Sequence, residues 1–108
     1  ISILYYNVRM LSVLLREKEG YRFYYVLKDG AGEYGGGLTE EGFFVCDEDC
    51  PQRELMLRTL VNKCMNEFIA EVKAKDEWGV DLARFGFEER DGYWFASFET
   101  LKLPHDCK

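Results

Sequence analysis

One amphipathic helix flanked by two short apolar segments constrains the fold of this chain most. Pro51 suits the first turn of the helix. Its apolar residues recur at helical spacing and are Leu55, Leu57, Leu60, Val61, Cys64, Met65 and Phe68. Residues 43–46 before the helix and residues 69–74 after it are typical of strands. A helix that joins two neighbouring strands is a right-handed crossover, so we expect these strands to pair in parallel.

The segment before this helix predicts an antiparallel meander. Residues 21–27 are dense in aromatic and β-branched side chains, and the turn residues 28–32 lead into a returning strand. A second turn at residues 39–42 then gives a third strand. Three consecutive glycines, Gly35 to Gly37, interrupt the returning strand and predict a bulge or a close approach of another backbone. Residues 2–6 predict a further strand at the start of the chain.

Residues 7–19 have two interpretations. Val8, Leu11, Leu14 and Leu15 recur at helical spacing, with Asn7 as N-cap and Gly20 at the C-terminal end, so we expect a helix. The alternative is an extended segment over residues 8–15, because Met10 and Val13 fall outside the helical stripe.

The last third of the chain predicts a short helix and a hairpin. Residues 76–84 form the helix with Asp76 as its cap, and Gly86 ends it. Asp91 and Gly92 are a strong turn signal between strands at 87–90 and 93–98. We therefore expect a single α/β domain over residues 1–108, built on a mixed, mostly antiparallel sheet with a central parallel pair and flanking helices.

Composition and charge argue against several functional classes. The net charge of −6 repels phosphate backbones and anionic lipids, so we expect neither a nucleic-acid nor a membrane partner. The apolar start of the chain is too short for a membrane span or a signal peptide. Four cysteines accompany a full aliphatic core, which indicates reduced thiols in a cytoplasmic protein. A zinc site built from Cys46, Cys50, His105 and Cys107 is the disfavoured alternative, because structural zinc sites mostly use tighter cysteine spacing, and we expect no metal.

The order of these elements, and two short motifs, resemble the GNAT family of acyltransferases. The family motif Arg/Gln-x-x-Gly-x-Gly/Ala aligns with residues 52–57, where Gln52 is kept and leucine replaces both small residues. The family's apolar-Gly-Phe step is reproduced at residues 85–87, with Leu82 at the position of its catalytic tyrosine. The resemblance covers nearly the whole chain and identifies it as a compact, divergent member.

The resemblance implies a cofactor site and an acyl-transfer reaction. Acetyl-CoA, or another acyl-CoA, is expected where the strands at 43–46 and 69–74 diverge, with its pyrophosphate at the start of the long helix. The expected contacts are Val45, Cys46, Gln52, Arg53, Glu54, Leu55, Met56 and Leu57. Acyl transfer to an amine also needs a base and an acid. The candidates are Glu33, Glu40 and Glu71 as base and Tyr34 or Tyr93 as acid, and of these Glu33, Glu71 and Tyr93 are preferred.

Two functions follow as hypotheses. The first is a divergent N-acetyltransferase-like protein that transfers an acyl group from acyl-CoA to a small-molecule or peptide amine. The second is a non-catalytic GNAT-like module that acts through interaction or homodimerisation. The glycine-rich residues 30–37 do not indicate a nucleotide loop, because strands follow them instead of a helix.

Overall fold

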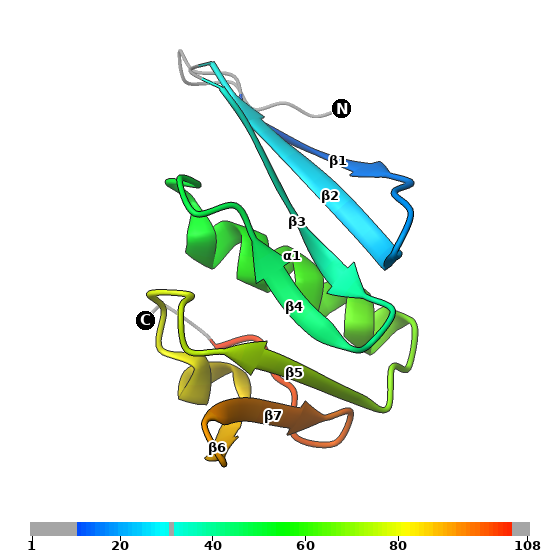
Figure 1. The fold of residues 1–108 in the computed structure, drawn as a ribbon, viewed down its shortest axis with the longest axis vertical. Helices are drawn as coiled ribbons and strands as arrows, with labels where there is room; N and C mark the ends of the chain where they lie inside the picture. The colour runs from blue at the N-terminus through cyan, green and yellow to red at the C-terminus, as the bar shows by residue number, and fades with distance from the viewer. Residues whose placement is uncertain (1–10, 31, 105–108) are drawn as a thin grey trace.

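The described residues fold into one seven-stranded mixed sheet with a single α-helix packed on one face (Figure 1). The computed structural model describes residues 11–30 and 32–104. Its strands are β1 (Leu11–Arg16), β2 (Tyr21–Asp29), β3 (Glu33–Thr39), β4 (Phe43–Cys46), β5 (Glu71–Lys75), β6 (Glu88–Arg90) and β7 (Tyr93–Ser97). Helix α1 spans Arg53–Asn66, and a 3-10 helix, η1, spans Leu82–Phe85.

The strand order β1-β2-β3-β4-β5-β7-β6 places the parallel pair at the centre of the sheet. β4 and β5 are parallel, and the other neighbouring strands are antiparallel. This confirms the predicted α/β class, the mixed sheet and the crossover through the long helix. The prediction of flanking helices was wrong for the described residues, where α1 is the only α-helix and η1 packs beside it in the same core.

The core lies between the sheet and α1. The helix buries Leu57, Leu60, Val61 and Cys64, which confirms much of the predicted apolar face, and it also buries Met56, which was not predicted. Leu55 and Met65 are half-buried at its margins. Phe68 was predicted to share this face, but it is 75% exposed. The reason is that α1 ends at Asn66 and Phe68 turns the chain outward with a positive φ of 56°.

Residues 11–16 form strand β1, so the preferred helical interpretation of residues 7–19 was wrong there and the extended alternative is confirmed. Val13 pairs with Leu27 and Leu15 pairs with Tyr25 on β2. Pairing with the edge of β2 lets alternate residues of β1 pack on the core, and this tertiary gain overrides a weak helical pattern. Gly20, predicted to end a helix, instead has φ 88° in the turn between β1 and β2.

The glycines of β3 allow close approach on both faces of the sheet, as predicted. A methyl group on Gly36 would lie 2.9 Å from the Met56 side chain of α1. On the opposite face, Gly37 lies beside a bulge in β2 between Tyr21 and Phe23, and its methyl group would lie 2.4 Å from the carbonyl oxygen of Phe23. The bulge and the close helix therefore both depend on the absence of a Cβ atom.

Gly37→Ala is expected to lower the free energy of unfolding by about 2 kcal/mol, because backbone atoms of β2 must move to admit the methyl group. Gly35→Ala is the matched control on the same strand and face. Its methyl group meets the hydroxyl end of the Tyr24 side chain, which can rotate away. Urea denaturation of both variants measures the difference. Equal stability of the two variants would contradict this account of the bulge.

The predicted helix at residues 76–84 is replaced by a loop and the shorter helix η1. Gly79 has φ 68°, which a continuous helix does not permit. The cap is Asp81, whose carboxylate accepts the N–H of Ala83 at 3.2 Å, and the prediction of Asp76 as cap was wrong. Gly86 ends η1 in the left-handed conformation, as predicted.

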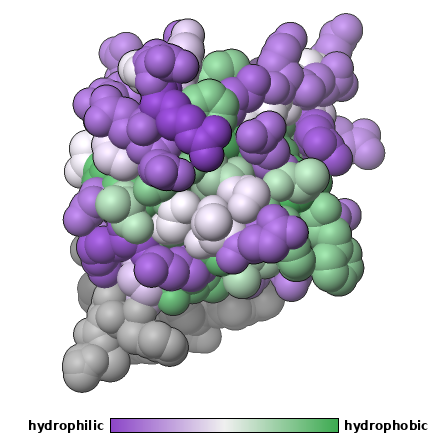
Figure 2. Space-filling view, turned by 90° about the horizontal axis from the view of Figure 1, so that it is seen from below, coloured by the Kyte–Doolittle hydropathy of each residue, from purple (hydrophilic) through white to green (hydrophobic). Residues whose placement is uncertain are grey.

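Strand β6 forms one edge of the sheet and consists of Glu88, Glu89 and Arg90, all exposed. Short, charged edge strands discourage pairing with another chain. Figure 2 views the molecule from below, and hydrophilic residues cover most of the face it shows, with smaller hydrophobic areas between them. The predicted strand at residues 2–6, the start of the 7–19 segment, His105 and Cys107 lie outside the described residues.

Candidate functional site

The two parallel strands separate at their C-terminal ends, beside the start of α1. β4 and β5 pair only at Phe43 with Lys73 and at Phe44 with Ala74. Beyond these positions Val45 and Cys46 pair with β3 alone, and Lys75 pairs with β7 alone. Figure 1 shows the two ribbons moving apart there. The divergence leaves backbone groups of both strands facing a gap in the middle of the sheet.

A cleft of about 520 Å³ occupies this divergence. Such a volume lies within the range of small-molecule sites. Residues of β4 surround it, together with the ends of β3 and β5, the β3–β4 turn, the loops that follow β4 and β5, and the start of α1. Its lining consists of Thr39, Glu41, Phe43, Phe44, Val45, Cys46, Glu48, Arg53, Lys75, Glu77 and Trp78.

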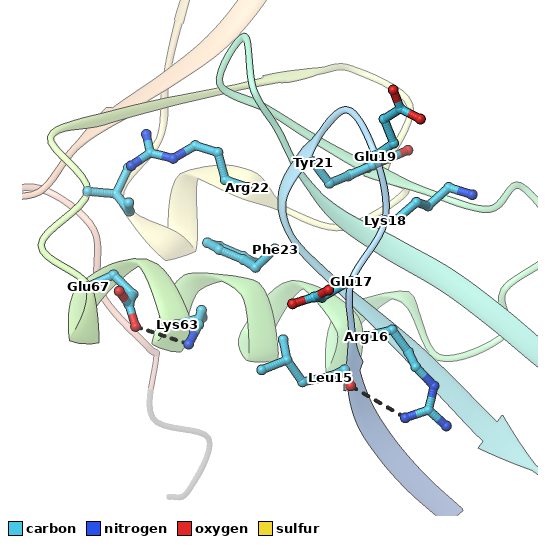
Figure 3. A pocket seen from close by; sticks show the side chains of 11 residues that line it. Leu15, Arg16, Glu17, Lys18, Glu19, Tyr21, Arg22, Phe23, Lys63 and Glu67 are labelled. Atoms are coloured by element: carbon cyan, nitrogen blue, oxygen red, sulfur yellow. Dashed lines mark hydrogen bonds and ion pairs between the residues drawn. The ribbon is translucent and has the colours of Figure 1, made fainter.

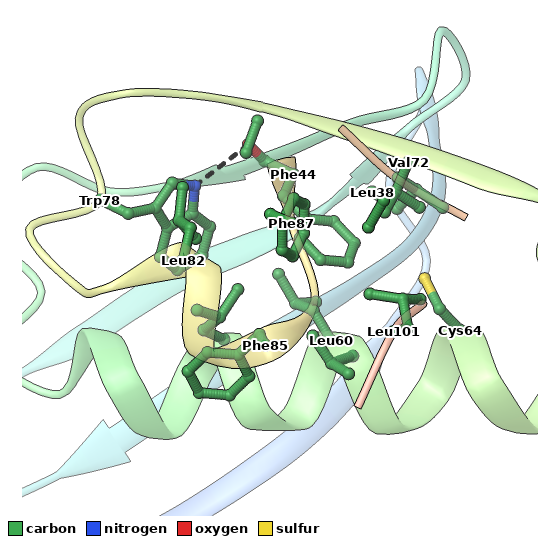
Figure 4. Close-up of a cluster of buried hydrophobic side chains, with 14 of the residues drawn as sticks. Leu38, Phe44, Leu60, Cys64, Val72, Trp78, Leu82, Phe85, Phe87 and Leu101 are labelled. Atoms are coloured by element: carbon green, nitrogen blue, oxygen red, sulfur yellow. Dashed lines mark hydrogen bonds between the residues drawn. The ribbon is translucent and has the colours of Figure 1, made fainter. Parts of the chain in front are cut away.

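Trp78 forms the inner wall of the cleft and fills part of the gap between the strands. Its side chain is 3% exposed, and its indole N–H donates a hydrogen bond of 3.4 Å to the carbonyl oxygen of Phe44 (Figure 4). The ring also packs edge-on against Phe44, with ring centroids 6.5 Å apart. Trp78 thus replaces a partner strand for the last paired residue of β4.

Arg53 closes the end of the cleft. Its guanidinium group donates to the carbonyl oxygens of Glu48 at 2.7 Å, Asp47 at 3.3 Å and Glu77 at 2.9 Å. One side chain in the first turn of α1 therefore ties the loop after β4 to the loop after β5. The planar array of donors on arginine suits such a bridge.

Of the sequence-predicted cofactor residues, some line the cleft and the others lie on the surface of α1 or in the core. Val45, Cys46 and Arg53 line the cleft. Gln52 is the N-cap of α1, and its side chain makes no capping hydrogen bond. Glu54 pairs with Arg58 at 3.2 Å on the helix surface. Leu55, Met56 and Leu57 contribute to the core below the sheet, with Met56 and Leu57 fully buried.

The start of α1 presents backbone donors next to the cleft. The first N–H groups of any helix have no acceptor within the helix, and the macrodipole makes this end positive. The carboxylate of Asp47, which precedes the helix, accepts the N–H of Gly35 at 2.8 Å and is thereby directed to β3. Pro51 lies before the N-cap instead of in the first turn, so α1 begins two residues later than predicted.

Two thiols lie near the end of β4, and one of them, Cys46, lines the cleft. Cys46 is half-buried at the end of β4, and Cys50 is 4% exposed in the turn that follows. Burial raises the pKa of the Cys46 thiol to about 12, and the nearby Cys50 thiol adds to the rise. The pKa of Cys46 is thus raised although the positive end of α1 lies nearby.

The sequence-predicted catalytic residues do not converge. Glu33 pairs with Lys28 at 3.5 Å near the β2–β3 turn, and Glu71 begins β5, at the opposite end from the cleft. Tyr93 lies beside the cleft, because its ring packs at 5.6 Å on Phe43, which lines it. Glu40 lies in the exposed turn after β3, and Tyr34 packs against the core.

Of the residues that line the cleft, only Val45, Cys46 and Arg53 were predicted as site residues, and Glu41, Glu77 and Trp78 are among those that were missed. Each lies in or next to a loop, and no motif surrounds it. The spacing assigned Trp78 to a helix, whereas Gly79 lets the chain turn so that the indole reaches β4. A buried tryptophan needs a partner for its N–H, and the open carbonyl of a diverging strand supplies one.

A second, wider pocket of about 870 Å³ lies at the far end of α1, beside the β1–β2 turn (Figure 3). Cations and carboxylates alternate around it, and Lys63 is paired with Glu67 at 3.0 Å. In Figure 3 the side chains of Arg16, Glu19 and Arg22 point in different directions and do not meet. This pocket therefore lacks a convergent set of polar groups, and the β4–β5 cleft is the better candidate site.

Comparison with protein-family models, curated proteins and solved structures finds no match to this chain. The GNAT resemblance thus stays a prediction, and the chemistry of the site rests on its own geometry. Among the described residues, no helix combines the length and apolar character needed to cross a membrane. The same residues contain no cluster of three or more metal-ligating side chains.

Proposed function

We propose that this protein binds an acyl-CoA in the β4–β5 cleft and transfers the acyl group to an amine. The observation that carries the proposal is the divergence of the parallel strands after two paired positions, at the end where α1 begins. Ligands of open α/β sheets bind outside the carboxyl ends of the strands, where neighbouring connections separate. This is also the position that the GNAT resemblance implies for acetyl-CoA.

The start of α1 supports binding of the pyrophosphate. Free backbone donors and the positive helix end favour an anion there. Leu55 and Leu57 replace the small residues of the family motif, but Leu57 is buried in the core and neither side chain lines the cleft. Arg53 adds a cation at the same place. The two leucines therefore occupy none of the cleft itself.

The cleft itself carries carboxylates for the proton transfer. An attacking amine must lose a proton, and Glu41, Glu48 or Glu77 is placed to accept it directly or through water. Tyr93, beside Phe43, is the proposed acid for the departing thiolate. Glu33 and Glu71 line neither the cleft nor its rim, so we assign them no step in this reaction.

A second function is favoured by Trp78. Its indole occupies the gap between the strands and already satisfies the Phe44 carbonyl. On this alternative the indole takes the place of a ligand between the strands, and the protein acts as a non-catalytic module that binds a partner or a second copy of itself. We place the protein in the cytoplasm under both functions, because Cys46, Cys50 and Cys64 are free thiols.

Thermal unfolding with acetyl-CoA distinguishes the two functions. Ligand at a hundredfold excess over its Kd adds about 2.7 kcal/mol of stability, which raises Tm by about 10 °C or more in a domain of this size. Arg53→Ala is expected to abolish most of this rise, because it removes a cation and releases both loops of the cleft. Arg22→Ala, a cation at the other pocket, is the control and should leave the rise unchanged. No rise at millimolar acetyl-CoA in the unaltered protein rules out the acyltransferase proposal.

A further inference from the structure

The C-terminal end of α1 presents an aromatic ring that the core does not use. Phe68 is 75% exposed, and its ring contacts that of Phe98 with the centroids 5.4 Å apart. Its two neighbours in the chain, Glu67 and Ile69, line the wider pocket at this end of the helix. An exposed aromatic ring therefore lies at the rim of this pocket.

Phe68 occupies a backbone position that favours glycine. Glu67 is the C-cap of α1, and the N–H of Phe68 donates to the carbonyl oxygen of Met65 at 3.4 Å. The N–H of Ile69 donates to the carbonyl oxygen of Cys64 at 3.0 Å. These are the two hydrogen bonds of a Schellman motif, in which the residue after the cap is left-handed and usually glycine. Phe68 has φ 56°, so its side chain strains the helix end without entering the core, which indicates a role outside the single chain.

The pocket beside Phe68 has an apolar floor and a rim of mixed charge. Phe23 and Ile69 are buried in its floor, and Leu15 is 52% exposed there. The side chains of Leu15 and Phe23 lie beside α1 in Figure 3. Four cations and three carboxylates complete the charged part of the lining. This near balance differs from the net charge of −6 of the chain, which makes most contacts between two copies repulsive.

We propose that a second copy of this chain covers this surface, in a two-fold symmetric dimer in which Phe68 of each copy enters the pocket of the other. A two-fold contact joins the same patch of both copies, so the patch must complement itself. This patch does so, because the ring lies next to an apolar hollow and cations of one copy can face carboxylates of the other. A partner with one sign of charge would instead meet like charges along the rim.

The dimer surface is separate from the β4–β5 cleft. The cleft lies beside Arg53 at the start of α1, and Phe68 follows the end of the same helix, so about 20 Å of helix separates them. The surface includes none of the residues that line the cleft. The inference thus names a surface for the self-association considered under the second function, and it is equally compatible with acyl-CoA binding.

Sedimentation equilibrium of the full chain tests the proposal. We expect a reversible monomer–dimer equilibrium, with a Kd that rises by about thirtyfold or more in Phe68→Gly, the scale of an aromatic hot spot. The urea midpoint of this variant, measured below the dimer Kd, should stay the same or rise, because glycine suits the left-handed position. Phe68→Leu keeps an apolar side chain and should weaken the dimer less. Asn62→Ala, on an exposed position of the same helix outside the pocket, is the control and should leave the Kd unchanged.

Photo-cross-linking locates the contact. A benzophenone analogue of phenylalanine is placed at position 68, and isotope-labelled and unlabelled chains are mixed so that links between copies differ in mass from links within one copy. We expect cross-links from position 68 to residues 15–23 of the other copy. This measurement does not depend on the stability of any glycine variant.

Three results would overturn the proposal. One is an unaltered protein that remains monomeric at millimolar concentration, and another is a Phe68→Gly variant that dimerises as tightly as the unaltered protein. The third is cross-links that stay within one copy or reach a different surface. The rise of Tm with acetyl-CoA is measured separately, so failure of the dimer and failure of acyl-CoA binding give different results.

Discussion

Gly86→Ala is expected to lower the free energy of unfolding by about 3 to 5 kcal/mol, through backbone strain and overpacking together. Gly86 has φ 96°, which an alanine adopts only at a cost. Its added methyl group would also lie 1.9 Å from the carbonyl oxygen of Thr100 and 3.1 Å from the Cα of Leu101. Both atoms belong to backbone, so no side-chain rotation relieves the overlap.

The segment that Gly86 touches is held firmly from its other side. The side-chain oxygen of Thr100 accepts the N–H of Ser97 at 3.0 Å, and the N–H of Leu101 donates to the Ser97 carbonyl oxygen at 2.9 Å. Lys102 then donates its N–H to Phe85 at 3.0 Å, next to Gly86 itself. Movement of this turn would therefore break hydrogen bonds and lift Leu101, which is 6% exposed, from the core.

Gly79→Ala separates the two causes. Gly79 also has a positive φ, 68°, but a methyl group there meets no atom within 4 Å. Gly79→Ala should therefore lower the free energy of unfolding only through backbone strain, by about 1 kcal/mol. Urea denaturation of the three proteins gives the comparison. If Gly86→Ala is no less stable than Gly79→Ala, the contact with Thr100 does not determine the need for glycine.

Much of the fold could be predicted from the sequence, because its central elements are specified locally. The β2–β3–β4 meander follows from aromatic strands separated by glycine turns, and α1 from a long stripe of apolar residues. The crossover rule then fixes β4 and β5 as parallel neighbours, which is what the structure shows. The expected place of the site came from the GNAT resemblance, which implies a ligand where these two strands diverge beside the start of the helix.

The errors occurred where local pattern and tertiary contact disagree. Leu11 to Leu15 fit both a helix and a strand, and only the free edge of β2 decides between them. The helix expected at residues 76–84 does not form, because Gly79 has a positive φ, and the spacing of apolar residues gives no sign of this. Catalytic residues were harder still to predict from the sequence. Glu33 and Glu71 were chosen as strand carboxylates, whereas the groups that line the cleft come mainly from β4, the loops after β4 and β5 and the start of α1.

Trp78→Ala is expected to lower the free energy of unfolding by about 3 to 5 kcal/mol, the usual cost of removing a buried aromatic ring. The indole is 3% exposed and lies between the diverging strands, where no other side chain replaces it. The loss is a large share of the 5 to 15 kcal/mol typical of a domain. Urea denaturation with the midpoint followed by circular dichroism measures it without relying on tryptophan fluorescence.

Two phenylalanine variants resolve the contribution of the indole N–H. Trp78→Phe keeps an aromatic ring but leaves the Phe44 carbonyl without its donor, so we expect a loss of about 1 to 2 kcal/mol. In Trp94→Phe the deleted N–H is buried and has no hydrogen-bond partner among the described residues, so its removal should cost less. Equal losses would show that ring size alone stabilises this part of the sheet. A larger loss at Trp78 would mean that its hydrogen bond holds the end of β4 in place, and with it the shape of the cleft in which an acyl-CoA is proposed to bind.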